Sequence, residues 1–151
     1  MAEQDQAQRL QWNEQVIEEF RANKGVVGGP FEGATLLLLT TRGAHTGLRR
    51  TMPLAALPAG EGRWAVFAAN GGRPHRPGWY YNLVAEPEVT VELGTERFRA
   101  VAADAAGEER ERLWAAQLAV LPALADFQAT APGPIPVVVL TRQGRDVSSD
   151  A

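Results

Sequence analysis

Positively charged side chains gather in two short stretches of a chain that is acidic overall. The chain has 151 residues and a formal net charge of −3. Residues 40–54 and 69–83 contain no aspartate or glutamate, and their cations are Arg42, His45, Arg49, Arg50, Arg73, His75 and Arg76. Nucleic-acid binders usually carry a net basic face, whereas two local clusters of cations on an acidic chain indicate a site for an anionic small molecule.

The second stretch, ANGGRPHRPGWYYNL, combines its cations with a loop that leads into a helix. Gly71 and Gly72 have no Cβ, so their backbone N–H groups can approach a ligand closely. The helix that follows Pro77 offers unpaired N–H donors in its first turn, and Asn82 could hydrogen-bond a heterocycle or cap a neighbouring turn. A tight turn followed by the core face of a short helix would use the same residues, so both interpretations stay open.

The first stretch places two arginines next to each other near the start of a predicted strand. Arginine's planar fork of donors suits phosphate and carboxylate oxygens. Because successive side chains of a strand point to opposite faces, only one of Arg49 and Arg50 would face a pocket directly, and the other would lie at its rim. A solvated sheet edge that discourages aggregation would also use such a pair.

Several classes of site lack their residues in this sequence. The chain has no cysteine, and His45 and His75 are far apart, so we expect no metal centre. No Ser-His-Asp or GxSxG arrangement supports a hydrolase, and neither GxGxxG nor GxxxxGK[ST] is present for a dinucleotide or ATP. The first residues lack the pattern of a signal peptide. We therefore expect a cytoplasmic protein with at most weak contact with the inner face of the membrane.

Hydrophobic periodicity and turn residues predict three helices and six strands in one domain. The predicted helices are Leu10–Asn23, residues 78–86 and residues 105–130, with Pro122 kinking or breaking the last. The predicted strands are residues 34–41, 48–57, 63–70, 88–93, 96–104 and 135–142. Mostly hairpin connections indicate an α+β fold with an antiparallel sheet or small barrel. Residues 1–24 belong to the same domain as residues 25–142, and residues 143–151 form a flexible tail.

Together these motifs resemble the deazaflavin-dependent nitroreductase family, oxidoreductases that use coenzyme F420 and adopt a split β-barrel. The resemblance runs from about Gly25 to Leu140 and rests on GGPFEGATLLLLTTRGAHTGLRRTMPL, AANGG, PGWYYNL, AEPEVTVELG, GEERERLWA and IPVVVLT. It implies hydride transfer from reduced F420 to an electron-poor acceptor such as a quinone or a nitroaromatic compound. Because the coenzyme carries the hydride, the protein has to hold donor and acceptor close together.

The resemblance also implies roles for residues of this chain. Arg49, Arg50 and Thr51 would bind the phosphate and glutamate tail of the coenzyme. Arg73, His75 and Arg76 would lie near the same anionic groups. The deazaflavin ring would be lined by Ala69, Asn70, Gly71, Gly72, Trp79 and Asn82.

The acceptor side departs from the family pattern. Many members carry a small hydroxyl residue where this chain has Asn70, and tyrosines where it has Leu124 and Phe127. We expect these residues to contact the acceptor, with Trp12 at the mouth of the pocket and Tyr81 or water as the proton donor. Two alternatives remain open: an FMN-dependent oxidoreductase on the same barrel, and a non-catalytic carrier that sequesters the deazaflavin. Other split barrels often dimerise, so a homodimer is expected by analogy alone.

Overall fold

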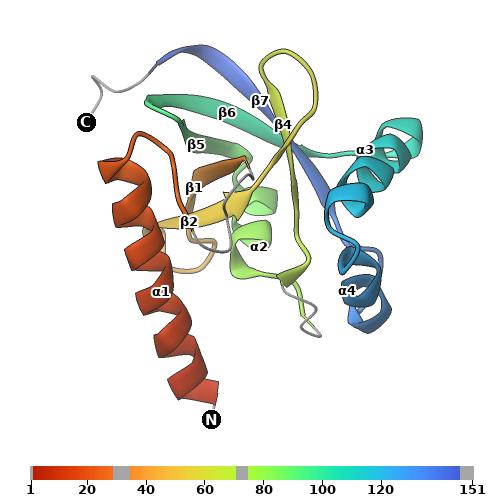
Figure 1. Ribbon diagram of the computed structural model, residues 1–151, viewed down its shortest axis with the longest axis horizontal. Helices are drawn as coiled ribbons and strands as arrows, with labels where there is room; N and C mark the ends of the chain where they lie inside the picture. The colour runs from red at the N-terminus through yellow and green to blue at the C-terminus, as the bar shows by residue number, and fades with distance from the viewer. Residues whose placement is uncertain (1, 29–34, 71–74, 147–151) are drawn as a thin grey trace.

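The computed structural model describes residues 2–28, 35–70 and 75–146, and within them four helices and seven strands form an α+β fold (Figure 1). The helices are α1 (Ala2–Ala22), α2 (Gly78–Ala85), α3 (Gly107–Val120) and α4 (Leu124–Thr130). The strands are β1 (Leu36–Arg42), β2 (Arg49–Ala55), β3 (Leu57–Pro58), β4 (Arg63–Phe67), β5 (Glu88–Leu93), β6 (Glu96–Asp104) and β7 (Val137–Asp146). They form one sheet in the order β2-β1-β5-β6-β7-β4-β3, and every neighbouring pair is antiparallel. The predicted α+β class and antiparallel sheet are confirmed, with seven strands in place of six.

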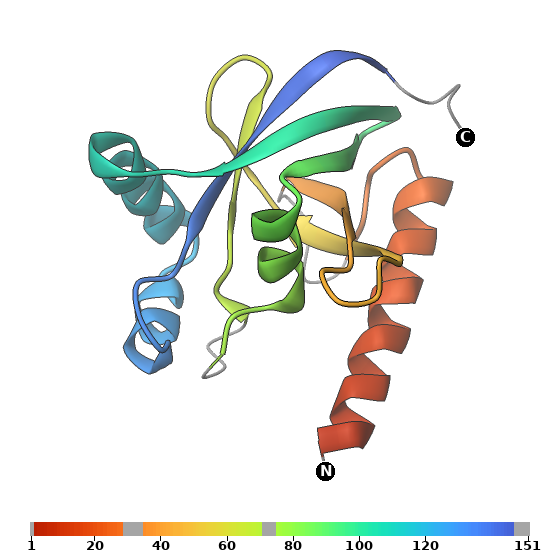
Figure 2. The same ribbon diagram turned by 180° about the vertical axis from the view of Figure 1, so that it is seen from behind.

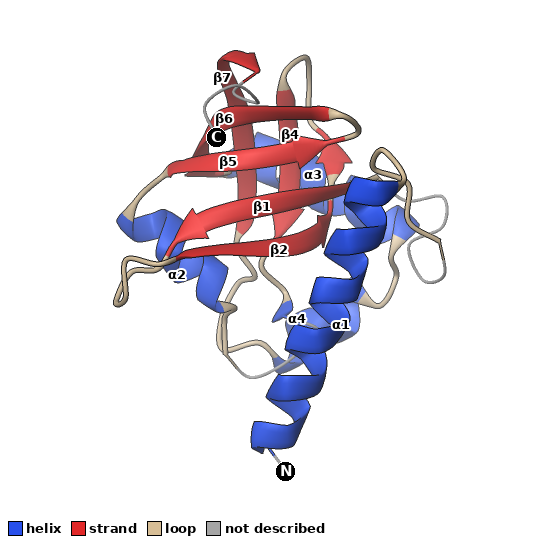
Figure 3. Ribbon diagram, turned by 90° about the vertical axis from the view of Figure 1, so that its left-hand side faces the viewer, coloured by secondary structure: helices blue, strands red, loops and turns tan. Residues whose placement is uncertain are grey.

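The two end strands of the sheet are consecutive in the chain. Only Ala56 separates β2 from β3, and its N–H donates to the carbonyl oxygen of Thr35 at 2.8 Å. The chain therefore bends between opposite ends of the strand order, and the sheet curls round on itself without closing (Figure 3). Leu57 was predicted as the end of the strand that precedes it. In the structure Leu57–Pro58 pairs with β4 instead, and this pairing makes the extra strand, β3.

β1 is buried on both faces, as its unbroken apolar sequence predicts. Leu37 and Leu39 lie in the main core with residues of β4, β5, β6 and β7. Leu36 and Leu38 point the other way, where Val16 and Phe20 of α1 cover them. Burying each such side chain contributes roughly 1.5–3 kcal/mol, so β1 joins α1 firmly to the sheet.

The C-terminal half of α1 packs on the outside of the sheet, and its N-terminal half extends beyond it (Figure 3). The helix begins at Ala2, well before the predicted start at Leu10, because alanine, glutamine and glutamate favour a helix even without an apolar stripe. At its other end the guanidinium of Arg21 donates to both carboxylate oxygens of Glu92, at 3.0 and 2.9 Å. Gly25 follows with φ +91° and packs so closely on Gly94 that a Cβ would lie 2.6 Å from the Gly94 Cα.

The second half of the chain confirms one prediction and corrects another. Residues 105–130 are broken at Pro122 into α3 and α4, as predicted, because Pro122 cannot donate the N–H that a continuous helix needs. Residues 143–146, predicted as part of a flexible tail, extend β7 and pair with β6. In the part of the chain that the structure describes, no helix combines the length and the apolar character needed to cross a membrane.

α2 packs against the core at one end of the curled sheet, next to the turn between β1 and β2 (Figure 2). Trp79 and Leu83, one helical turn apart, are 6% and 3% exposed and belong to the main core. The helix ends at Ala85 because Glu86 precedes Pro87 and takes an extended conformation. α2, which begins within the second cationic stretch, therefore packs beside the turn of the first.

Candidate functional site

The β1–β2 hairpin carries three arginines at the end next to its turn. The register places Arg42 directly opposite Arg49, and Thr41 opposite Arg50. All three arginines are exposed, and Nε of Arg42 donates to the carbonyl oxygen of Gly47 at 3.2 Å. Like charges directly opposite each other destabilise a strand pair, so this arrangement favours a bound anion. Arg42 was identified in the sequence only as a cation of the first stretch, although counting outward from the turn would have placed it opposite Arg49.

Arg49 and Arg50 have different surroundings from the arginines that form ion pairs. Among the residues that the structure describes, no carboxylate lies within ion-pair distance of either guanidinium. By contrast, Arg63 Nη2 lies 2.9 Å from Glu109 Oε2. The guanidinium donors of Arg49 and Arg50 are thus available for phosphate or carboxylate oxygens.

Thr51, the third residue predicted to bind the coenzyme tail, shares a hydrogen bond with the opposite strand. Its Oγ1 lies 2.8 Å from Oγ1 of Thr40. In such a pair one hydroxyl donates to the other, and the accepting hydroxyl keeps its own hydrogen for another acceptor. The pair can therefore offer one further O–H donor beside the arginines. Nothing in the sequence pattern points to Thr40, because its pairing with Thr51 depends on the register of β1 and β2.

Asn82 links α2 to the turn of the hairpin. Its Nδ2 donates to Oγ1 of Thr41 at 3.0 Å, and its Oδ1 accepts from the N–H of Ala44 at 3.0 Å. Thr41 is only 2% exposed, so the amide also satisfies a buried hydroxyl. Of the two interpretations of Asn82, the structure shows the turn cap, while a contact with a heterocycle stays a prediction.

The second cationic stretch is described only at its two ends, because the predicted residues Gly71, Gly72 and Arg73 lie outside the described residues. Before this gap, Asn70 has φ +53°, a conformation that asparagine tolerates better than most residues. Its Nδ2 donates to the carbonyl oxygen of His75, after the gap, at 2.9 Å. Asn70 thus joins the two ends of the Gly-Gly segment. His75 is exposed and Ala69 is half-buried, and their contacts with a coenzyme stay predictions.

Arg76 is engaged on the other side of α2 from the hairpin. Its Nη2 donates to the carbonyl oxygen of Pro134 at 3.4 Å, and its guanidinium lies 5.8 Å from the centre of the Tyr80 ring. The hydroxyl of Tyr80 donates to Oδ2 of Asp104 at 2.9 Å. Burial, and then the hydrogen bond to Asp104, raise the pKa of Tyr80 above its usual value. Because Tyr80 and Asn82 are about 200° apart around the helix, Arg76 and the hairpin arginines belong to different sides of α2.

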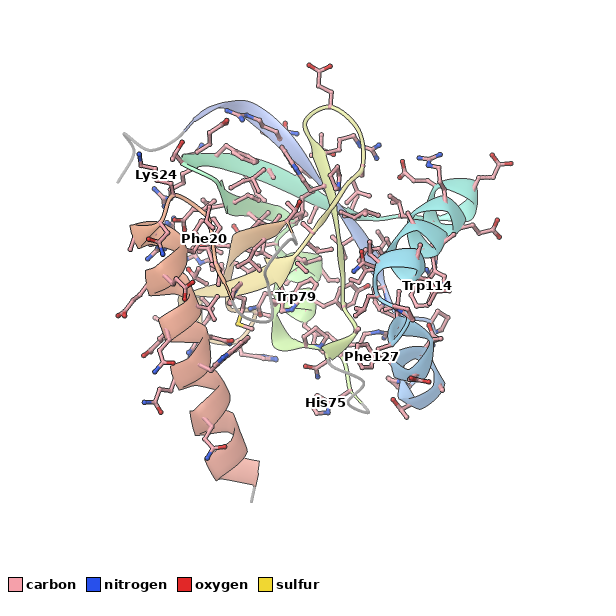
Figure 4. The ribbon with its side chains drawn as sticks, in the orientation of Figure 1. Phe20, Lys24, His75, Trp79, Trp114 and Phe127 are labelled. Carbon is pink, nitrogen blue, oxygen red and sulfur yellow. The ribbon has the colours of Figure 1, made fainter. Side chains whose placement is uncertain are left out.

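The residues predicted to contact the acceptor differ widely in exposure. Trp12 and Tyr81 are 44% and 50% exposed, whereas Leu124 is 1% exposed. Phe127 is half-buried, and Figure 4 shows it at the same end of the molecule as His75. Trp12, Tyr81 and Phe127 are thus accessible from solvent, and their contacts with an acceptor stay predictions, whereas Leu124, like Trp79, lies in the interior.

Comparison with known proteins identifies the family of this chain. The family model described as F420H(2)-dependent quinone reductase matches residues 12–142. An F420H(2)-dependent quinone reductase of Mycobacterium tuberculosis (strain ATCC 25618 / H37Rv) is 36% identical over 130 residues, which cover 82% of this chain and 85% of the relative. The resemblance to deazaflavin-dependent reductases is thereby confirmed.

Two solved structures are similar over most of the chain. One is described as an F420-H2 dependent reductase, FDR-A, with TM-score 0.63, 34% identity and coverage of 70% of this chain and 93% of the other. Another, described as a domain-swapped dimer, has TM-score 0.66, 31% identity and coverage of 84% and 94%. From the matched family model and these similarities over most of its length, the chain belongs to the F420H(2)-dependent quinone reductase family.

Proposed function

We propose that this chain is an oxidoreductase that transfers a hydride from reduced coenzyme F420 to a quinone. Its family and its relative in Mycobacterium tuberculosis are named for this activity. The observation in the structure that carries the proposal is the exposed Arg49–Arg50 pair, which has no carboxylate partner among the described residues. A coenzyme with a phosphate and a glutamate tail supplies the anionic groups that this pair lacks.

The residues around the hairpin suit the anionic end of F420. Residues 35–60 contain no aspartate or glutamate, so nothing on this part of the chain repels a phosphate. Arg42 stands opposite Arg49, and the Thr40–Thr51 pair adds a hydroxyl donor. We place the deazaflavin ring on the side of Asn70 and α2.

The chain's own contribution to the reaction is to bind and orient. F420 supplies the hydride when bound, so the protein needs no covalent nucleophile. Asn82 fixes the hairpin turn and Asn70 fixes the ends of the Gly-Gly segment, and both bonds exist before any ligand arrives. Such preorganisation lowers the entropy cost of bringing the reacting carbons together. Trp12 and Phe127 cover the acceptor, and the exposed hydroxyl of Tyr81, or water, gives the proton to the reduced quinone.

The test measures the oxidation of reduced F420 by a water-soluble quinone, with the recovery of F420 absorbance as the readout. We expect oxidation that depends on both the protein and the quinone, and saturable binding of F420 in a fluorescence titration. A parallel titration with FMN distinguishes the flavin enzyme, which would bind FMN in preference. Tight F420 binding without oxidation over a panel of quinones and nitroaromatic compounds would identify a carrier instead.

We also propose that the protein assembles as a homodimer. The support is a solved structure at 31% identity that is described as a domain-swapped dimer. Light scattering should then give twice the 16.3 kDa of the chain. A mass equal to one chain at micromolar concentration would contradict this assembly.

A further inference from the structure

The turn that follows α4 makes two hydrogen bonds with a side-chain amide of that helix. Residues 131–136, APGPIP, include three prolines, so only Ala131, Gly133 and Ile135 carry a backbone N–H. Oε1 of Gln128 accepts from the N–H of Ile135 at 2.9 Å, and Nε2 of Gln128 donates to the carbonyl oxygen of Gly133 at 2.9 Å. We call this pair of bonds the Gln128 clamp. Ile135 is 1% exposed, so water cannot readily replace the acceptor that Gln128 provides.

The other side of the same turn supports the segment predicted to hold the coenzyme ring. The N–H of Ala68 donates to the carbonyl oxygen of Pro136 at 3.0 Å, and Arg76 donates to Pro134. Ala69 and His75 line a small hollow against residues 131–136. The turn therefore lies between α4 and the two described ends of the Gly-Gly segment.

A second side chain holds the turn from α3. Nη2 of Arg110 donates to the carbonyl oxygen of Ile135 at 2.8 Å, and its guanidinium lies 5.3 Å from the centre of the Trp114 ring. Arg110 therefore donates to the carbonyl oxygen of Ile135, while Gln128 accepts from the N–H of the same residue. The Gln128 clamp ties the far end of the turn to α4, the helix that carries Phe127, and the N–H of Ala131 donates to the backbone carbonyl oxygen of Gln128 at 3.3 Å at the near end.

We propose that Gln128 is a positioning residue that sets the distance between the acceptor side, marked by Phe127, and the coenzyme segment around Asn70. This inference rests on the proposed function. Hydride transfer is sensitive to small displacements of the two reacting carbons. Loss of the clamp therefore slows transfer to the quinone more than it weakens coenzyme binding, because Arg49 and Arg50 lie on the other side of α2.

The first experiment replaces the amide by an apolar side chain of similar length, Gln128→Met, with Gln117→Met on α3 as the matched control. We expect kcat with the quinone to fall roughly 10-fold or more in Gln128→Met, while the Kd for F420 changes less than about 3-fold. The control should leave both constants unchanged. In the coenzyme-free protein, hydrogen exchange of the Ile135 amide should become faster in Gln128→Met, while the amides of β7 keep their protection.

A second variant, Gln128→Glu, separates a positioning role from general packing. A protonated carboxyl can donate to Gly133 and accept from Ile135, as the amide does, whereas an ionised carboxylate can only accept. The ratio of kcat for Gln128→Glu to kcat for the wild type should therefore rise as the pH falls through the titration of that carboxyl. Gln128→Met should show a flat ratio over the same pH range.

Three results would overturn the inference: wild-type kcat in Gln128→Met, equal losses of kcat and F420 affinity, or a flat ratio for Gln128→Glu. A wild-type protein that binds F420 but does not oxidise its reduced form contradicts the proposed function instead. In that case the exchange of the Ile135 amide still decides whether Gln128 holds the turn, because that measurement needs neither coenzyme nor quinone.

Discussion

Arg63 of β4 forms an ion pair with Glu109 of α3, whereas Arg49 of β2 lies opposite another arginine, Arg42, in the β1–β2 hairpin. The same division runs through much of the described chain. Arginine–carboxylate pairs join elements that are distant in sequence, namely Arg21–Glu92, Arg63–Glu109 and Arg142–Glu96. At the hairpin the arginines lie close to one another, and the described part of the chain offers Arg49 and Arg50 no carboxylate.

This contrast separates arginines that hold the fold from the hairpin arginines, which we propose bind the coenzyme. An ion pair between α3 and β4 contributes to the stability of the folded chain, whereas opposed cations on a hairpin reduce it. Departures from local stability rules are expected mainly where a binding site needs them. The two groups should therefore respond oppositely to mutation, with binding lost in one and stability lost in the other.

The largest effect is expected when Arg49 and Arg50 are both replaced by alanine. Each hydrogen bond to a charged group contributes about 1.5–3 kcal/mol, so the affinity for F420 should fall roughly 100-fold or more. The Tm should stay the same or rise, because the repulsion between Arg42 and Arg49 is removed. Fluorescence titration with F420 and thermal unfolding measure both properties on one sample.

The control for this double variant removes the same charge elsewhere, by Lys24→Ala together with Arg112→Ala. Both residues are exposed; Lys24 follows α1 beside Gly25, which packs on Gly94, and Arg112 lies on α3, so both are away from the turn of the hairpin. Binding should then change only through the long-range field, which salt screens within about 10 Å at 0.1 M. Equal losses of affinity in the two double variants would show that total charge, and not the hairpin, attracts the coenzyme.

The sequence located the hairpin cluster because its information is local. A turn rich in glycine between two apolar segments predicts the β1–β2 pair, and the alternating β5–β6 hairpin was predicted with its observed bounds because its pattern is equally local. β3 could not be predicted, because two residues give no period and their pairing depends on where β4 lies. The C-terminal end of β7 could not be predicted for the same reason, because residues 143–146 pair with β6 and their own sequence shows no strand pattern.

The candidate site, too, could be predicted only as far as its residues are determined by local sequence. Residue types identified Arg49 and Arg50 as candidate anion binders, but the absence of carboxylates around them in the described chain depends on the packing of the whole sheet. Asn82 had two equally good interpretations in the sequence, and only the position of Ala44 and Thr41 selected the turn cap. The resemblance implied that Trp79 lines the deazaflavin ring, while its place on a short helix also fitted a core residue, and the structure buries it in the core.

A smaller effect, on stability alone, is expected from Arg63→Met. The guanidinium of Arg63 donates to Glu109 at 2.9 Å and to the carbonyl oxygen of Ala59 at 3.2 Å, and both charged side chains are one-third exposed. The free energy of unfolding should therefore fall by about 1 kcal/mol, while the affinity for F420 stays within about 2-fold of the wild type. Urea unfolding and fluorescence titration provide the two values. A loss of affinity without a loss of stability would place Arg63 with the ligand-binding arginines.

The smallest effect is expected for Arg76→Ala, which decides to which group Arg76 belongs. Its sequence position puts it in the second cationic stretch, but its contacts with Pro134 and the Tyr80 ring resemble those of the arginines that hold the fold. A hydrogen bond of 3.4 Å is weak and an exposed cation–π contact contributes about 0.5–1 kcal/mol. We therefore expect F420 affinity to fall less than about 3-fold, which corresponds to about 0.6 kcal/mol, with a slightly lower Tm.

A loss of affinity as large as that of the Arg49 and Arg50 variant would mean that the guanidinium of Arg76 leaves Pro134 when the coenzyme binds. The boundary between the two groups would then depend on the bound state, and the contacts of the free protein would not be enough to assign an arginine to the fold.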